Sequence, residues 1–209
     1  MRLDVWSDFA CPWCLLGKRR LEHALEGRDD VDVHWRAYEL QPDMPADGQP
    51  RSVLERKLGG PERLQQAQAR ITGLGAAIGL QYAFEKQQRM SNTRLAHRAV
   101  ALAGEHRAAL VDALFRAHFE EGLDLSPRSA VVDVAAAVGL DRPTLERALQ
   151  GDGGLKDVLA DQALAGELGI RGVPCFVADM KVSVSGAQEV ETFRQFLEEA
   201  ASGPRSPAG

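Results

Sequence analysis

The sequence predicts an α/β fold in which a single β-sheet is built from both ends of the chain and interrupted by helices. Three observations support this prediction: a strand–helix–strand pattern at the start, a helix–strand–strand–helix pattern at the end, and a middle that is helical and nearly strand-free. We therefore expect a discontinuous sheet domain from residues 1–50 plus 152–201, a helical insertion at 51–151 and a flexible tail at 202–209.

The N-terminal pattern is the most regular. Residues 2–7 alternate, with Leu3 and Val5 on one face, which is typical of a short strand. A helix with leucines on one face follows and ends at Gly27. Residues 31–38 alternate again and predict a second strand. Two strands joined by one helix indicate a right-handed βαβ unit with parallel strands.

After the second predicted strand, the spacing of the apolar residues changes from alternation to helical steps. Residues 39–50 hold three prolines and lead out of the sheet. Apolar side chains then recur at steps of three and four, which predicts a series of amphipathic helices up to residue 151. The last third predicts a helix, two short strands and a final helix, at residues 154–168, 175–178, 181–185 and 190–200.

Composition excludes several classes of protein. The chain has 209 residues, 25 basic against 30 acidic, and a formal net charge of −5, which does not favour a nucleic-acid partner. The sequence contains neither a signal-peptide core nor a membrane-spanning segment, so we expect no membrane association and a cytoplasmic location. Thiols are kept reduced there, and a closely spaced cysteine pair is more often catalytic than structural.

The segment FACPWC, Phe9 to Cys14, holds two of the three cysteines where the first strand passes into the first helix. At a helix start, free N–H groups and the positive end of the helix dipole stabilise a Cys11 thiolate. Cys14 lies one turn further on the same face, and Pro12 suits the first helical position. We therefore expect an exposed Cys11 of low pKa that attacks disulfides and a Cys14 that resolves the mixed disulfide.

Two other interpretations of the pair are a structural disulfide and half of a zinc site. Zinc needs two more ligands, and the remaining candidates, Cys175 and five scattered histidines, lack ligand spacing. We expect no metal.

Several segments together resemble the DsbA family, and most closely its FrnE-like cytoplasmic branch. They are VWSDFACPWCLLGK, WRAYELQP, NTRLAHRA, LFRAHFEEGLDLS and GIRGVPCFV followed by VSGAQ. The resemblance implies a thioredoxin fold interrupted by an all-helical insertion, and dithiol-disulfide oxidoreductase or isomerase activity. It makes Cys11 the nucleophile and Cys14 the resolving thiol, with no cofactor beyond this redox pair and with glutathione as a conceivable co-substrate.

The resemblance also suggests a substrate-binding surface. Pro174 matches the family's cis-proline, whose loop faces the active site and lets the Val173 backbone pair with an extended substrate. Pro12 and Trp13, between the cysteines, would contact substrate, although Trp13 could instead pack on the insertion.

Cys175 departs from the pattern, because a bulky apolar residue usually follows that proline. It would be either a third thiol near the substrate that can be oxidised, or a small buried hydrophobe on a strand. Asn92 would be either near the substrate cleft or a helix N-cap. Asp8 and Glu39 could shuttle a proton or cap loops, and Lys18 is expected on a solvated helix surface.

The leading hypothesis is thus an oxidoreductase that acts on disulfides of proteins or small molecules and is recycled by a cellular thiol reductant. The sequence does not decide between a monomer and a homodimer. The alternative is a glutathione-dependent isomerase or transferase of small aromatic molecules, similar to kappa-class transferases and hydroxychromene-carboxylate isomerases. Those enzymes usually carry serine at the positions of Cys11 and Cys14. A third hypothesis makes the helical block a partner-binding module and the cysteine pair incidental.

Overall fold

A computed structural model describes residues 1–202, so most of the tail predicted at 202–209 lies outside the described residues. One mixed sheet has the strand order β2-β1-β5-β6. Its strands are β1 (Arg2–Ser7), β2 (Asp32–Ala37), β5 (Cys175–Ala178) and β6 (Val182–Ser185). β1 pairs in parallel with β2 and antiparallel with β5, and β5 pairs antiparallel with β6. The prediction of one sheet built from both chain ends is confirmed.

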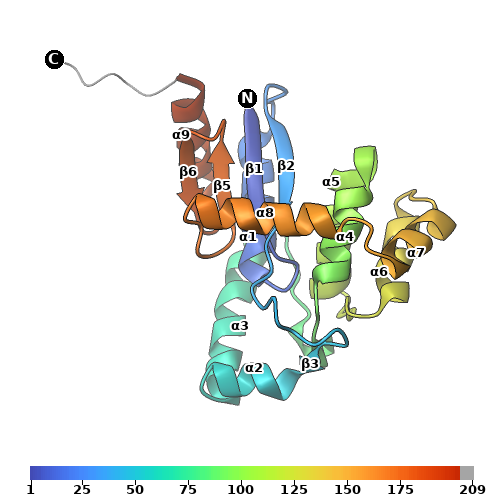
Figure 1. The fold of residues 1–209 in the computed structure, drawn as a ribbon. Helices are drawn as coiled ribbons and strands as arrows, with labels where there is room; N and C mark the ends of the chain where they lie inside the picture. The colour runs from blue at the N-terminus through green and yellow to red at the C-terminus, as the bar shows by residue number, and fades with distance from the viewer. Residues whose placement is uncertain (203–209) are drawn as a thin grey trace.

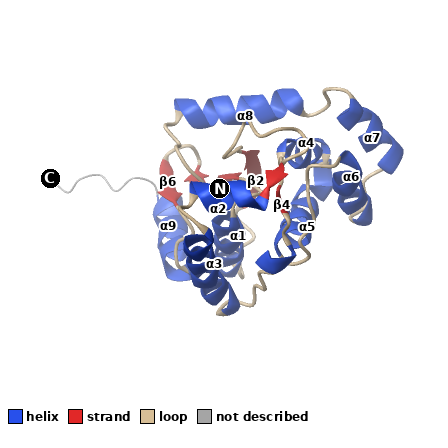
Figure 2. Cartoon of the chain, turned by 90° about the horizontal axis from the view of Figure 1, so that it is seen from below, coloured by secondary structure: helices blue, strands red, loops and turns tan. Residues whose placement is uncertain are grey.

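Helices cover both faces of the sheet, because side chains alternate along β1. Leu3 and Val5 face α1 (Pro12–Leu25) and α9 (Val190–Ser202), and Trp6 faces α8 (Leu155–Glu167). Figure 1 shows α8 crossing the sheet, and Figure 2 shows α8 on the opposite side of the strands from α1 and α9. The parallel β1–α1–β2 unit is the one that the sequence predicts.

The middle of the chain forms the expected helical block. Its helices are α2 (Arg51–Lys57), α3 (Pro61–Ala76), α4 (Arg94–Leu102), α5 (Arg107–Phe119), α6 (Arg128–Ala137) and α7 (Arg142–Gln150), with 3₁₀ turns η1 (Phe84–Lys86) and η2 (Gly104–His106). A two-residue ladder between β3 (Gln49–Pro50) and β4 (Arg89–Met90) adds a small second sheet. Strands of two residues are too short to produce an alternating pattern, so the sequence carries no sign of them.

The largest hydrophobic cluster belongs to both parts of the chain. It contains Phe9, Cys14 and Leu16 from the sheet side, and Leu114 and Phe115 from α5. The block therefore shares a core with the start of α1, and the division at residues 51 and 151 stays a prediction. Across residues 1–202, no helix combines the length and the apolar character needed to cross a membrane.

Candidate active site

The cysteine motif occupies the turn between β1 and α1. Cys11 is the residue before the helix and has an extended backbone, and Pro12 is the first helical residue. The Cys11 amide donates to the Asp8 carbonyl and the Cys14 amide donates to the Cys11 carbonyl, both at 3.0 Å. The motif thus lies at a helix start, as its sequence predicts.

The two thiols are free and unequally enclosed. Cys14 is 1% exposed, and Asp8 donates its backbone N–H to the Cys14 sulfur at 3.5 Å. Cys11 is 6% exposed, so the prediction of an exposed nucleophile is wrong. Its thiol points at the Val173 carbonyl, 3.7 Å away, and Val173 and Trp13 pack against the same cluster. Cys11 is therefore enclosed by Trp13 of the motif and by Val173 of a distant loop.

The pKa values of the two thiols are displaced in opposite directions. A hydrogen bond from the Cys14 thiol lowers the pKa of Cys11, against the opposing effect of burial, and the backbone N–H groups of Cys14 and Trp13 act in the same direction. Burial raises the pKa of Cys14 well above its usual value, and the neighbouring Cys11 raises it further. Of the two thiols, Cys11 has the environment that favours the thiolate, and Cys14 has the one that favours the protonated form.

The proline loop opposite the motif has the predicted conformation. The Val173–Pro174 peptide bond is cis, and the Pro174 carbonyl accepts a hydrogen bond from Gly186 at 2.8 Å. Gly17 of α1 allows this loop to lie close: a Cβ atom there would be 3.0 Å from Pro174 Cγ and 3.2 Å from Phe176. The sequence analysis missed Gly17, for which the only signal is a glycine inside a helix.

An open groove of about 550 Å³ runs beside this loop, and Arg171, Val173, Pro174 and Cys175 are among the residues that line it. The Cys175 thiol is buried, accepts a hydrogen bond from Ser185 at 3.7 Å, and belongs to the cluster under α8, whereas Cys11 and Cys14 belong to the large cluster. Burial raises the pKa of Cys175. This is the environment of a small buried hydrophobe; competition with the redox pair stays a prediction.

Asp8 joins the motif to the rest of the chain. Its buried carboxylate accepts hydrogen bonds from Ala10 N (3.1 Å), Leu40 N (2.8 Å) and Thr93 Oγ1 (2.8 Å), and His97 Nε2 lies 3.5 Å away. Burial alone would raise the pKa of Asp8, but His97 and the two amides lower it below its usual value. Asp8 is an ionised structural carboxylate.

Asn92 and Glu39 also have structural partners. Asn92 Nδ2 donates to the Met44 carbonyl at 2.8 Å, and its Oδ1 accepts from the Arg94 amide at 3.0 Å, so its side chain is committed to the fold. Glu39 pairs with Arg94 at 3.0 Å and accepts from Gln162 at 2.8 Å. Thr93, not Asn92, is the N-cap of α4, so the N-cap alternative for Asn92 is wrong, and the partners of Glu39 are side chains of α4 and α8.

Lys18 is not on the surface, so that prediction is wrong. Its side chain is buried between α1 and α5, where it pairs with Asp112 at 2.8 Å and with Glu22. The helical surface expected from α1 alone is covered by α5. Lys18 fastens the insertion to the helix that carries the cysteines.

The insertion contacts both residues between the cysteines. The Tyr82 hydroxyl donates to the Pro12 carbonyl at 2.7 Å, and the Arg70 guanidinium lies 5.8 Å from the centre of the Trp13 ring. Trp13 thus packs on the insertion. Sequence reasoning missed Tyr82, because nothing in its neighbourhood marks a contact with a residue seventy positions earlier.

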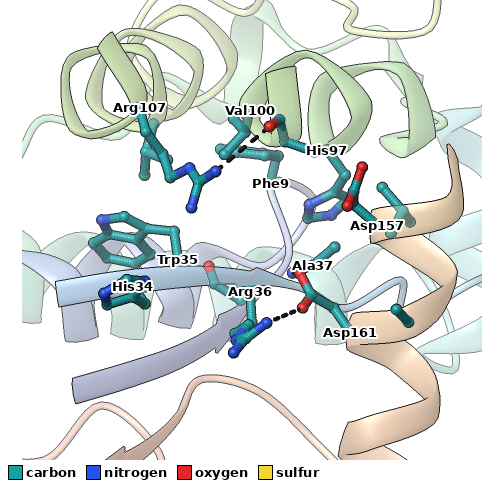
Figure 3. A pocket seen from close by; sticks show the side chains of 15 residues that line it. Phe9, His34, Trp35, Arg36, Ala37, His97, Val100, Arg107, Asp157 and Asp161 are labelled. Carbon is teal, nitrogen blue, oxygen red and sulfur yellow. Dashed lines mark hydrogen bonds and ion pairs between the residues drawn. The ribbon is translucent and has the colours of Figure 1, made fainter. Parts of the chain in front are cut away.

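A second cavity, of about 170 Å³, lies behind Asp8 and is not part of the thiol site. It opens between β2, α4, α5 and α8, and Figure 3 shows Trp35, His97 and Arg107 around it, with Arg36 bound to Asp161 at 2.6 Å. Neither cysteine of the motif lines it. Within residues 1–202, no group of three or more His, Cys, Asp or Glu side chains is placed to hold a metal ion.

Comparisons with known proteins agree with this geometry. Residues 2–198 match the family model described as a DSBA-like thioredoxin domain. A probable DsbA oxidoreductase, SCO1869, of Streptomyces coelicolor is 37% identical, with a TM-score of 0.88 over 100% of this chain and 93% of that one.

Two more distant structures share the fold. The structure of a 2-hydroxychromene-2-carboxylate isomerase is 20% identical, with a TM-score of 0.71 over 97% of this chain and 95% of that one. The cytosolic disulfide reductase DsbM of Pseudomonas aeruginosa, in a structure with GSH, is 22% identical. Its TM-score is 0.69, over 95% of this chain and 98% of that one.

Gly17→Ala is expected to push the Pro174 loop away from α1 and to lower the free energy of unfolding by about 1–3 kcal/mol, because the new methyl group has no room. Gly73→Ala in α3 is the matched control: nothing lies within 4 Å of its Cβ position, so it should stabilise by about 0.5–1 kcal/mol. Urea unfolding measures both. Equal effects of the two substitutions would contradict the close packing at Gly17.

Asp8→Asn is expected to destabilise the protein mainly above about pH 4. The folded-state pKa of Asp8 lies below its unfolded value, so its ionisation stabilises the fold above the unfolded pKa and ceases to do so as pH falls through the folded pKa. The difference in unfolding free energy between wild type and Asp8→Asn should therefore shrink below about pH 4. Urea unfolding across this range tests it, and a difference independent of pH would refute it.

Proposed function

The chain belongs to the DSBA-like thioredoxin-domain family, and from this we propose that it is a thiol-disulfide oxidoreductase with Cys11 as nucleophile and Cys14 as resolving thiol. The observation that carries the proposal is the opposite displacement of the two thiol pKa values at one helix start. A lowered pKa increases the thiolate fraction of the attacking sulfur, and a raised pKa keeps the second sulfur protonated until it is needed.

The reaction proceeds in two exchanges. The Cys11 thiolate attacks one sulfur of a substrate disulfide, a Cys11–substrate disulfide forms, and the other substrate sulfur leaves as a thiolate that takes up a proton. Cys14 then loses its proton and attacks the Cys11 sulfur, which releases the second substrate thiol and leaves a Cys11–Cys14 disulfide. The substrate gains two electrons and two protons, and the enzyme loses them.

We further assign the protein to the FrnE-like branch, with a cytoplasmic location and reduction or isomerisation as its net reaction. A cellular thiol returns the Cys11–Cys14 disulfide to the dithiol, and glutathione is a candidate for that role. The fold that this chain shares with DsbM, described as a cytosolic disulfide reductase, supports this choice. Substrates bind along the groove beside Pro174, one lining residue of which, Val173, has its carbonyl 3.7 Å from the Cys11 sulfur.

A glutathione-dependent isomerase is the second candidate, favoured by the fold shared with a 2-hydroxychromene-2-carboxylate isomerase. The enclosed Cys14 thiol argues against it, because its hydrogen bond to Cys11 belongs to a dithiol mechanism. A partner-binding role for the insertion alone does not account for the hydrogen bonds that Tyr82 and Thr93 of the insertion donate to the turn around the cysteine motif.

Cys14→Ser is expected to accumulate mixed disulfides on Cys11, because the thiol that releases them is gone. Purification of the variant from cells, followed by mass analysis of the peptide that contains Cys11, identifies the captured thiols. Cys175→Ser, with both motif cysteines intact, is the control and should accumulate none. Absence of adducts on Cys11 in the first variant would contradict the assignment of the nucleophile.

Protein-disulfide reduction by wild type and Cys14→Ser separates the two candidate functions. A dithiol reductase should lose at least about tenfold of its insulin-reducing rate in Cys14→Ser, because every turnover needs the resolving step. An isomerase that binds glutathione and forms no disulfide would reduce no insulin in either form and would retain aromatic isomerisation in the variant. The second result would replace the proposed function.

A further inference from the structure

Tyr82 lies in the short segment between α3 and η1, and its ring is fixed by packing within the insertion. It stacks on Phe84 with ring centres 5.1 Å apart and meets the edge of Phe119 at 5.7 Å. Gly75 makes room for it, since a Cβ atom there would approach the ring to 2.6 Å. These contacts use the ring alone, so phenylalanine could satisfy them equally well.

The hydroxyl group has a different partner. It donates to the Pro12 carbonyl oxygen at 2.7 Å, inside the turn that carries both motif thiols. Pro12 is the first residue of α1, and its carbonyl belongs to the same peptide unit as the Trp13 N–H, one of the backbone groups that lower the pKa of Cys11.

Tyr82 and the redox pair also influence one another's charge. Burial raises the pKa of Tyr82, and the negative charges of Cys11 and Cys14 raise it further, whereas Arg20 opposes them. The phenol thus stays neutral and acts only as a hydrogen-bond donor. The repulsion by Cys11 and Cys14 requires an ionised phenol, so the neutral hydroxyl acts on the Cys11 thiolate only through its hydrogen bond to the turn.

We propose that Tyr82 is a positioning residue for the thiol exchange, whose hydroxyl stabilises the Cys11 thiolate by withdrawing negative charge from the Pro12 carbonyl. This inference rests on the proposed function for its biological meaning. Electrostatic effects of this kind are strong here because the turn is buried and poorly screened by water. The insertion would then tune the reactivity of the motif as well as cover it.

Other groups act on the same thiolate and stay constant in the comparison below. On α1, Cys14 stabilises it in the dithiol protein and is replaced by serine in both proteins of the titration, and in the preceding turn the Asp8 carboxylate opposes it. From α3, Arg70 reaches the neighbouring Trp13 ring. Tyr82→Phe changes none of these groups and keeps the ring packing.

The test is the pKa of Cys11, measured from thiolate absorbance in a Cys14→Ser, Cys175→Ser background, where Cys11 is the one remaining cysteine. Tyr82→Phe should raise that pKa by about half a unit, roughly a threefold loss of thiolate relative to thiol. In the intact dithiol protein, the same variant should lower the reduction potential by about 15 mV.

Tyr38→Phe is the matched control, since Tyr38 is the chain's other tyrosine and packs on the sheet face under α8. It should leave the Cys11 pKa unchanged. An equal shift in both variants, or none in Tyr82→Phe with its fold intact by circular dichroism, would overturn the proposal. A loss of stability without a pKa shift would show that the hydroxyl only holds the fold, and would overturn it too.

A second measurement avoids any variant at Tyr82 itself. Fluorotyrosine incorporated into the Tyr38→Phe protein labels Tyr82 alone and makes its hydroxyl a stronger donor, which should lower the Cys11 pKa; a rise or no change would contradict the proposal. Neither titration needs turnover. A pKa shift in a protein that reduces no disulfide would therefore refute the proposed function and leave this inference standing. Disulfide reduction by the wild type without a pKa shift in Tyr82→Phe would refute this inference and leave the proposed function standing.

Discussion

The arrangement of this molecule depends on one buried carboxylate, that of Asp8. Removing a carboxylate from water is unfavourable unless hydrogen bonds replace the water, and here three donors and a nearby histidine do so. The donors come from the cysteine turn (Ala10), the chain after β2 (Leu40) and the start of α4 (Thr93). These three segments can satisfy the charge only when they converge at the end of β1. The residue that follows β1 therefore fixes where the insertion meets the cysteine motif.

The three cysteines illustrate how position, and not residue type, determines thiol chemistry. Cys11 precedes a helix and receives hydrogen bonds, Cys14 lies one turn inside the core, and Cys175 lies on a strand under α8. Hydrogen bonding lowers the pKa of Cys11, and burial raises the pKa values of Cys14 and Cys175. Cys175 lines the groove beside Val173, but only Cys11, whose sulfur contacts the Val173 carbonyl, has a lowered pKa.

The parts of the structure that the sequence predicts are those set by local periodicity. The alternation of residues 2–7 and the placement of Cys11 before Pro12 act over a few residues, so strand, helix and motif follow from spacing. Lys18 and Tyr82 were misjudged or missed because their partners lie 94 and 70 residues away in the chain. A helix surface predicted in isolation is polar and solvated; whether another helix will cover it depends on tertiary packing, which periodicity does not encode.

The helical insertion is best understood as half of the active site. It reaches the motif from one side through Tyr82, on the carbonyl between the cysteines, and from the other through Thr93, on Asp8. Lys18 ties the same helix to α5, and the largest core cluster runs without a break from Cys14 into the insertion. Without that block, the two thiols would lose most of the apolar surface that encloses Cys14 and so raises its pKa. The opposite pKa shifts of Cys11 and Cys14 thus depend jointly on the sheet and on the helices inserted into it.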